Sequence, residues 1–487
     1  MKRTKIVATI GPASEDKKVL TQMIKAGMNV ARLNFSHGIH EGHLKLINNI
    51  RGVSKELGRM ITIIQDLQGP RIRIGEMNDG GFEFKKGQEL SLIYSTKKFI
   101  APRKGEMAMV PIHYDLAKDL KKGERILIED GLIQLEIKKV VAGKIICVTS
   151  VGGTIKTHKG MNFPDSHLSA PALPKKDLED LAFGIKNEVD FVAVSFVKDD
   201  HDIINLREHI FNLEKKFGRV KKDQTKPMTK IIAKIERKEA VDNFEKILKV
   251  VDGIMVARGD LGIELPFERV PLIQKEIIWK CNYAGKPVIV ATQMLDSMIR
   301  NPLPTRAEVS DVANAILDGA DAVMLSGESA GGSYPILAVS AMYRIAKEVE
   351  PAQFRMQQEL ESHLKNIKTI PDFVAFNAQD VAERMQAKTI VCLTENGDMA
   401  RLINRYKSRV PLAVFTPSDM VCRQLNLSWG IDSYKVPFGR SEDEIVKNAL
   451  DILKKKKILK KGDKVAIAAG QIFSHFKKNN FLELESI

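Results

Sequence analysis

Cysteine is scarce in this chain, and its few residues lack the paired spacing of a disulfide framework. They are Cys147, Cys281, Cys392 and Cys422. Isolated cysteines of this kind are typical of reduced, buried thiols. The cysteine pattern therefore predicts a cytoplasmic protein.

Long apolar segments are missing as well. No run approaches the roughly 18 consecutive apolar residues that a membrane-spanning helix needs, and residues 1–10 are too short in apolar length for a signal peptide. The apolar share of 44% and the charged share of 28% are ordinary for a globular protein. A length of 487 residues provides for about two to four domains. We expect no membrane partner.

Aromatic residues make up only 6% of the chain, although its net charge is +15 and its pI is about 9.4. A basic chain can bind nucleic acid, but no basic stretch here is interleaved with Phe or Tyr for base stacking. The densest basic run, residues 454–457, closes a segment of helical pattern, where cations favour the negative end of the helix dipole. We therefore expect no nucleic-acid partner and interpret the charge as the surface of an enzyme for anionic metabolites.

Eight short apolar runs, separated by segments of helical pattern, organise most of the sequence. They cover residues 5–10, 28–33, 60–64, 191–194, 231–235, 253–257, 288–291 and 322–325. Continuous Val, Ile and Ala are typical of buried parallel strands. Eight strand–helix units predict a (β/α)₈ TIM barrel, and polar residues at the strand ends predict chemistry at its carboxyl face.

The barrel pattern is interrupted once and then gives way to a different one. We expect a first part of the TIM barrel over 1–70, an inserted β-barrel lid domain over 71–171, a second part of the barrel over 172–350, and a C-terminal open α/β domain over 351–487. Residues 357–368 read as a polar, helical linker. An insertion at the carboxyl face can close over the site as a lid.

Short strands are expected in both smaller domains. In the insertion they cover 82–84, 89–94, 125–128, 134–140 and 144–149, and in the last domain 388–393, 412–415 and 464–468, with helices around 380–386 and 441–453.

The most informative polar residues follow two consecutive barrel strands. Lys234 and Glu236 are two apart and share a face where one strand ends, and Asp260 follows the next strand. Two carboxylates with open positions suit Mg²⁺ better than Zn²⁺, and Lys234 would face charge on a substrate. The alternative for each motif is a salt-bridge network at the barrel rim.

A second group comes from the preceding strands. Arg32 and Arg73 offer planar forks for phosphate or carboxylate. The oxygens of Asn34, Ser36 and Asp66 could surround a monovalent cation or bond to each other.

Polar residues also end the last two barrel strands. Thr292 and Gln293 follow one of them, and Ser326 and Glu328 follow the other. These residues either orient a substrate or bond neighbouring loops.

Several segments resemble pyruvate kinase. They are residues 4–14 (TKIVATIGPAS), 28–38 (MNVARLNFSHG), 231–236 (IIAKIE), 252–262 (DGIMVARGDLG), 284–295 (AGKPVIVATQML) and 304–314 (PTRAEVSDVAN). The resemblance is specific over residues 1–350 and weaker in the C-terminal domain.

The resemblance implies a glycolytic reaction in which the phosphoryl group of phosphoenolpyruvate moves to ADP, giving pyruvate and ATP, in a homotetramer. It implies catalytic roles for Lys234, Thr292 and Arg32, with Gly259 and Asp260 also binding the substrate. It further implies that Glu236 and Asp260 hold Mg²⁺ or Mn²⁺, and that Arg73, Lys159 and Asn34 bind the nucleotide.

One stretch departs from most of the family. Members that use K⁺ carry Thr-Lys-Gly-Pro-Glu where this chain has Leu67-Gln-Gly-Pro-Arg71, which resembles a minority branch that works without K⁺. Two hypotheses follow. Either the guanidinium of Arg71 supplies the charge of the ion, or Arg71 faces solvent and K⁺ still occupies a pocket formed by Asn34, Ser36, Asp66 and Leu67.

Two other functions compete with this interpretation. One is a Mg²⁺-dependent TIM-barrel lyase or aldolase acting on pyruvate enolates, which would need no pair such as Arg32 and Arg73 to clamp nucleotide phosphates. The other is a non-catalytic scaffold whose basic surface holds RNA or polyphosphate, and the presence of Lys234, Glu236 and Asp260 argues against it.

Overall fold

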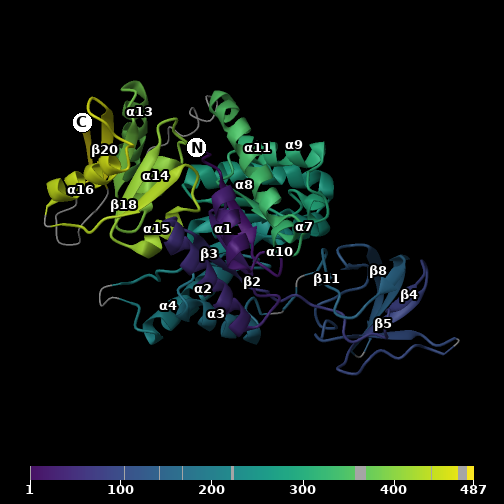
Figure 1. Cartoon of the computed structure of the whole chain (residues 1–487). Helices are drawn as coiled ribbons and strands as arrows, with labels where there is room; N and C mark the ends of the chain where they lie inside the picture. Colours follow the sequence, from purple (N-terminus) through teal and green to yellow (C-terminus); the bar gives the residue numbers. More distant parts are fainter. Residues whose placement is uncertain are drawn as a thin grey trace.

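Eight parallel strands close into a barrel at the centre of the molecule, with β1 pairing with β2 on one side and β16 on the other (Figure 1). The computed structural model describes residues 2–103, 105–141, 143–166, 168–169, 171–220, 224–356, 369–439, 441–469 and 480–487. The barrel strands are β1 (Lys5–Thr9), β2 (Val30–Asn34), β3 (Thr62–Asp66), β12 (Phe191–Val194), β13 (Lys230–Ile235), β14 (Gly253–Ala257), β15 (Val288–Ala291) and β16 (Ala322–Leu325). The predicted TIM barrel is confirmed. The linker expected at 357–368 lies outside the described residues.

Helices surround the barrel and bury their apolar faces against it. They are α1 (Lys17–Ala26), α2 (His40–Leu57), α3 (Lys175–Lys186), α4 (Asp200–Lys216), α5 (Lys238–Asp242), α6 (Phe244–Val250), α7 (Arg258–Glu264), η1 (Phe267–Arg269), α8 (Val270–Ala284), η2 (Asp296–Ile299), α9 (Arg306–Leu317), α10 (Gly327–Ala330) and α11 (Pro335–Met356). Local signals define their ends. Thr305 and Glu308 form a capping box at the start of α9, and Gly285, in the left-handed conformation, ends α8.

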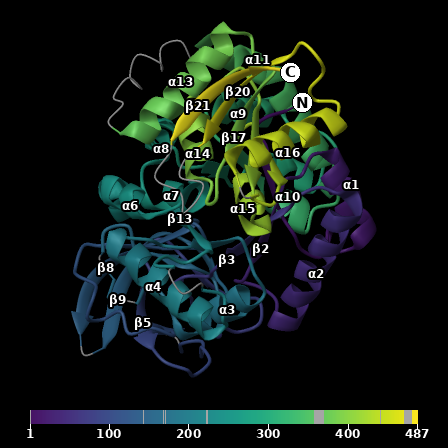
Figure 2. The ribbon, with the colours of Figure 1, turned by 90° about the vertical axis from the view of Figure 1, so that its left-hand side faces the viewer.

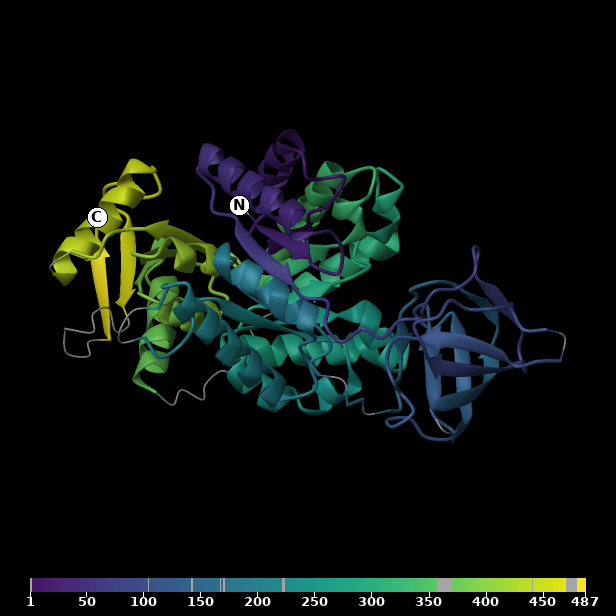
Figure 3. The same cartoon turned by 90° about the horizontal axis from the view of Figure 1, so that it is seen from below.

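The inserted domain lies between β3 and β12 along the chain and projects from the barrel on the side away from the C-terminal domain (Figures 1 and 3). Its strands are β4 (Phe82–Phe84), β5 (Glu89–Tyr94), β6 (Ala108–Ile112), β7 (Arg125–Ile128), β8 (Ile133–Val141), β9 (Lys144–Val151), β10 (Gly153–Ile155) and β11 (Met161–Asn162). Six form one sheet in the order β11-β7-β8-β9-β5-β6, and β10 pairs with β4. The domain has an apolar core of its own.

The C-terminal domain is an open α/β sheet in the order β19-β18-β17-β20-β21 (Figure 2). Its strands are β17 (Thr389–Leu393), β18 (Leu412–Thr416), β19 (Ile431–Lys435), β20 (Lys464–Ala469) and β21 (Phe481–Ser486), and its helices are α13 (Ile370–Arg384), α14 (Asp398–Asn404), α15 (Asp419–Leu425) and α16 (Glu442–Lys455). Helices α13 and α14 pack on one face of the sheet and α16 on the other. Only β21 runs antiparallel to its neighbour among these strands.

Strands β6, β10, β11, β19 and β21 were not expected from the sequence. Strand β6 contains Pro111, which weakens a strand pattern, and β10 and β11 are too short to show alternation. Strands β19 and β21 are the two edges of their sheet and keep many polar, exposed residues.

The C-terminal domain docks on the amino end of the barrel strands through buried ion pairs. Asp321, which precedes β16, accepts hydrogen bonds from Nζ of Lys407 at 2.8 Å and from the backbone N–H of Trp429 at 2.9 Å. Asp190, which precedes β12, pairs with Arg423 of α15 at 2.7 Å. This docking leaves the carboxyl ends of the strands free.

The Asp321–Lys407 pair should be essential to this docking. We expect Asp321→Ala to lower the free energy of unfolding by about 3 kcal/mol, because it leaves a buried ammonium without its counter-charge. Urea unfolding followed through the fluorescence of buried Trp429 measures the change. The control is Asp419→Asn, which breaks the exposed pair with Lys435 and should cost less than about 1 kcal/mol. Equal effects of the two substitutions would contradict the expectation.

Candidate active site

Lys234 lies near the end of β13, buried at the carboxyl end of the barrel. Its Nζ is 2.8 Å from Oε1 of Glu236 and 3.3 Å from Oδ1 of Asp66. It also donates a hydrogen bond of 2.8 Å to Oγ of Ser195. Burial disfavours the ammonium, but the two carboxylates outweigh it and raise the pKa of Lys234 above its ordinary value. The lysine is therefore a fixed positive charge.

Arg32 projects from β2 and shares the carboxylate of Asp66 with Lys234. Its Nε is 2.6 Å from Oδ2 of Asp66, and it donates a second hydrogen bond of 2.9 Å to Oγ1 of Thr9. Burial alone would raise the pKa of Asp66, but the charges of Lys234 and Arg32 hold it below its usual range. These contacts form one charge cluster, which consists of Thr9, Arg32, Asp66 and Lys234 from strands β1, β2, β3 and β13.

Glu236 and Asp260 are brought together beside this cluster. Oε2 of Glu236 accepts a hydrogen bond of 2.7 Å from the backbone N–H of Phe196, which adopts φ 57°. Asp260 lies in the first turn of α7, half-exposed, with Oδ1 at 3.9 Å from the guanidinium of Arg71. Burial and the negative charge of Asp260 raise the pKa of Glu236 to about 7, although Lys234 opposes the shift. Two carboxylates close enough to repel one another can hold a cation.

A strained turn follows β15. Thr292 has φ 71°, which is unfavourable for a β-branched residue, and Gln293 has φ 53°. Oγ1 of Thr292 accepts a hydrogen bond of 2.7 Å from the backbone N–H of Gly259 and donates one of 2.6 Å to the carbonyl of Ala291. The guanidinium of Arg258 donates to the carbonyl of Thr292 at 2.8 Å. These bonds hold the turn against its strain.

A cavity of 1110 Å³ opens between the barrel and the inserted domain. Its walls include Gly259, Asp260 and Thr292 from the barrel, Arg71 from the segment that leaves the barrel, and Asp130 from the turn between β7 and β8 of the inserted domain. Oδ1 of Asp130 accepts a hydrogen bond of 3.3 Å from Arg71. The cavity is lined by charged, polar and apolar residues together, a combination that is common in small-molecule sites.

Two other predicted residues lie in the inserted domain, apart from the barrel cluster. Arg73 donates a hydrogen bond of 3.0 Å to the carbonyl of His158, and Lys159 pairs with Glu129. The pKa of Arg73 is lowered by burial and by the neighbouring charge of Arg71.

The remaining predicted residues lie on two segments: Asn34 ends β2 and is closely followed by Ser36, and Leu67 directly follows β3. Oδ1 of Asn34 accepts a hydrogen bond of 3.1 Å from the backbone N–H of Ser36. The carbonyl of Leu67 accepts a hydrogen bond of 2.7 Å from Oγ of Ser195. The segment after β2 therefore adjoins the charge cluster at the backbone of Asp66, and the segment after β3 adjoins it at Ser195.

The sequence assigns no role to several residues that shape the site. Ser195 and Arg258 stand out only as polar residues that directly follow β12 and β14, and Thr9 ends β1 with a hydroxyl group. Nothing in the sequence distinguishes the backbone of Phe196. Glu328 accepts hydrogen bonds from the backbone N–H groups of Leu295 at 3.1 Å and Ser326 at 2.7 Å. For Glu328 the structure thus favours the alternative of bonding neighbouring loops.

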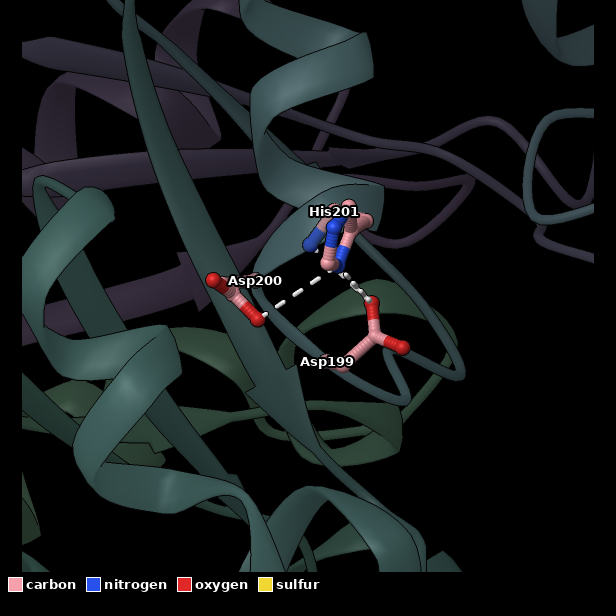
Figure 4. A group of neighbouring side chains, drawn as sticks. All are labelled: Asp199, Asp200 and His201. Atoms are coloured by element: carbon pink, nitrogen blue, oxygen red, sulfur yellow. Dashed lines mark hydrogen bonds and ion pairs between the residues drawn. The ribbon is translucent and has the colours of Figure 1, made fainter.

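Elsewhere in the described part of the chain, three potential metal ligands come within 4.8 Å of one another only at Asp199, Asp200 and His201 (Figure 4). Asp199 caps α4 by accepting hydrogen bonds from two backbone N–H groups, and the imidazole of His201 is 81% exposed. Acidic residues at this position stabilise the helix dipole, so the group has a structural explanation.

The cysteines of this chain are free and buried. Among the described helices, none combines the length and apolar character that a bilayer crossing requires.

The fold and the charge cluster define a class: barrel enzymes with an inserted lid domain and ionic chemistry at the carboxyl face. A family model described as "Pyruvate kinase, barrel domain" matches residues 1–339, and one described as "Pyruvate kinase, alpha/beta domain" matches residues 372–484. The chain therefore belongs to the pyruvate kinase family, whose members are phosphotransferases.

Full-length relatives agree with this assignment. The chain is 44% identical to a pyruvate kinase of Clostridium perfringens and 40% identical to one of Clostridium acetobutylicum, with 100% of each chain covered. It is 42% identical to a pyruvate kinase of Geobacillus stearothermophilus, of which it covers 80%. A crystal structure of a pyruvate kinase from Cryptosporidium parvum superposes with a TM-score of 0.90 at 35% identity, covering 100% of this chain and 96% of that one.

The hydroxyl group of Thr292 should stabilise the strained turn. We expect Thr292→Val to lower the free energy of unfolding by about 2 kcal/mol, because it leaves the N–H of Gly259 without an acceptor. Thr292→Ser keeps the hydroxyl and should stay within about 0.5 kcal/mol of the wild type. Urea denaturation of the three proteins in one buffer provides the comparison, and indistinguishable Val and Ser variants would refute this role of the hydroxyl.

Proposed function

We propose that this chain transfers the phosphoryl group of phosphoenolpyruvate to ADP and releases pyruvate and ATP. The observation that carries the proposal is the buried ammonium of Lys234, held between Asp66 and Glu236 at the mouth of the barrel. Phosphoryl transfer requires mainly positioning of the reactants and neutralisation of negative charge. A fixed cation in a largely dry site is suited to both.

Glu236 and Asp260 are the proposed ligands of Mg²⁺, or of Mn²⁺ in its place. The donor set fits such an ion, because both side chains offer hard carboxylate oxygens and the negative charge of Asp260 acts on Glu236. When bound, the ion would neutralise charge on the transferring phosphoryl group.

The remaining barrel residues are proposed to bind phosphoenolpyruvate. Arg32 presents a guanidinium that Asp66 and Thr9 already orient, so little freedom is lost when an anion binds. The backbone N–H groups of Gly259 and Asp260, at the start of α7, are proposed to bind the substrate carboxylate, and for this Gly259 would exchange its hydrogen bond to Oγ1 of Thr292 for one to the substrate. Thr292 lies against Gly259 and would contact the same end of the substrate.

Arg73 and Lys159 of the inserted domain, with Asn34 of the barrel, are proposed to bind the nucleotide. Arg71 and Asp130 of this domain line the cavity, so closure of the domain would bring Arg73 and Lys159 toward the substrate and exclude water. Exclusion of water matters because water competes with ADP for the phosphoryl group.

We also propose the domain bounds 1–70, 71–171, 172–350 and 351–487. The first two boundaries are supported by the positions of β3, which ends at Asp66, and of α3, which begins at Lys175, whereas the last boundary falls within α11, which continues to Met356.

A coupled assay with phosphoenolpyruvate, ADP and Mg²⁺ tests the proposed reaction. We expect ADP-dependent pyruvate formation that stops when the divalent ion is chelated, and a loss of about 1,000-fold in kcat for Lys234→Met. The control is Lys230→Met at the opposite end of the same strand, where the ammonium pairs with Asp252 at 3.4 Å; its kcat should remain near that of the wild type. Pyruvate formation without ADP would instead support a lyase.

We further propose that the enzyme works without K⁺. Asp66, the one carboxylate of the predicted monovalent-cation pocket, is already paired with Arg32 and Lys234. The guanidinium of Arg71, 3.3 Å from Asp130 and 3.9 Å from Asp260, is proposed to supply the positive charge that K⁺ would otherwise bring.

Replacing Na⁺ and K⁺ by tetramethylammonium tests this independence. We expect the wild-type rate to stay within about twofold, Arg71→Lys to behave similarly, and Arg71→Glu to require added K⁺ because its cationic charge is lost. A collapse of the wild-type rate in the absence of K⁺ would contradict the proposal.

A further inference from the structure

The first turn of α3 contacts two segments that adjoin the charge cluster. This helix is the first barrel element after the inserted domain. Its residues Lys176 and Asp177 are consecutive, and consecutive side chains on a helix point in different directions. They reach the loop after β2 and the segment after β3, respectively.

Lys176 holds the loop after β2. Its Nζ donates a hydrogen bond of 2.7 Å to the carbonyl of Phe35, the residue between Asn34 and Ser36. The same Nζ is 2.6 Å from Oδ2 of Asp180, one turn further along α3. The ammonium is therefore oriented by its own helix and directed at the backbone of the loop.

The same loop is anchored on its other sides. The backbone N–H of Phe35 donates to the carbonyl of Asp66 at 2.9 Å, and its ring stacks on the imidazole of His43 at 3.9 Å between centroids. Nε2 of His43 lies 2.9 Å from the carbonyl of His37. Lys176 supplies the bond to the Phe35 carbonyl that ties the loop to α3.

Asp177 holds the segment by which the chain leaves the barrel. Its side chain is buried, and Oδ2 accepts a hydrogen bond of 2.7 Å from the backbone N–H of Gly69. Gly69 has φ 72°, and a Cβ there would lie 2.8 Å from Cβ of Ser195, so the segment packs tightly on the residue that follows β12. Asp177 thus links the segment by which the chain leaves the barrel to α3, the helix at which it returns.

Ser195 connects the segment that contains Gly69 with the charge cluster. Its Oγ accepts a hydrogen bond from Nζ of Lys234 at 2.8 Å and donates one to the carbonyl of Leu67 at 2.7 Å. The adjacent backbone N–H of Phe196 donates to Glu236 at 2.7 Å. A displacement of the exit segment would therefore reach both Lys234 and Glu236.

We propose that Lys176 and Asp177 are positioning residues for phosphoryl transfer: together they hold Phe35 and Gly69, and so fix the Asn34–Ser36 loop and the base of the lid relative to Lys234. The inference rests on the proposed function, because it assigns these residues to the same reaction. Neither side chain contacts the cluster directly, so each acts through the backbone that it holds. A misplacement of about 1 Å in such a site can cost up to 100-fold in rate.

Steady-state kinetics of matched variants test the proposal. Lys176→Met should lower kcat/KM for phosphoenolpyruvate and ADP by about tenfold or more, and Lys176→Arg should recover most of the loss, because it restores a donor. The matched control is Lys175→Met, whose side chain is 91% exposed, and it should match the wild type. Thermal midpoints of Lys176→Met and its control should agree, since Lys176 is half-exposed.

Asp177 offers an independent comparison. Asp177→Ala should lower kcat, whereas Asp177→Asn, which keeps an acceptor for the N–H of Gly69, should retain most of it. If Asp177→Ala does not fold, the Lys176 series still decides the matter.

The outcomes separate the two claims. Wild-type kinetics in both Lys176→Met and Asp177→Ala would overturn the positioning role and leave the proposed function intact. A lower thermal midpoint with unchanged kcat and KM would assign the residues to stability alone and would likewise overturn the role. A wild-type protein without phosphoryl transfer would refute the proposed function and this inference together.

Discussion

The ammonium of Lys234, buried between two carboxylates, is the interaction on which the candidate site depends. A lone charge at this depth would be strongly destabilising, so Asp66 and Glu236 are needed simply to keep it there. Arg32 balances the charge of a second carboxylate. The net charge of the group is therefore close to zero before any substrate binds; its members are Lys234, Arg32, Asp66 and Glu236. Asp260, beside the cluster, adds a further negative charge, and we propose that a divalent cation binds between it and Glu236.

The ion pairs that hold the C-terminal domain and the side chains of the candidate active site lie at opposite ends of the barrel strands. Buried ion pairs of Asp190 and Asp321 fasten the C-terminal domain to the amino ends of the strands. At the carboxyl ends, the cavity is lined mainly by helices α7, α8 and α9 of the barrel and is bordered by Arg71 and Asp130 of the inserted domain. Helix α3 begins where the chain returns from the inserted domain to the barrel. Its first turn holds the backbone of Phe35 and Gly69, and we propose that it influences the site through them without touching the charge cluster.

The sequence predicted much of the architecture because buried parallel strands are apolar throughout. The eight barrel runs stand out for this reason, whereas edge strands such as β19 keep polar residues and were missed. The grouping of Lys234 with Glu236 followed from the two-residue period of a strand. The left-handed backbone of Thr292 and Phe196 could not be foreseen, because it arises from contacts between distant segments such as the one that Arg258 makes. No sequence spacing encodes such contacts.

The location of the divalent ion tests the central claim most directly. Crystals grown with Mn²⁺ would reveal the ion by its anomalous scattering. We expect one strong peak that lies about 2.0–2.2 Å from a carboxylate oxygen of both Glu236 and Asp260. A peak at another group of carboxylates, with these two side chains pointing apart, would contradict a shared ion beside Lys234.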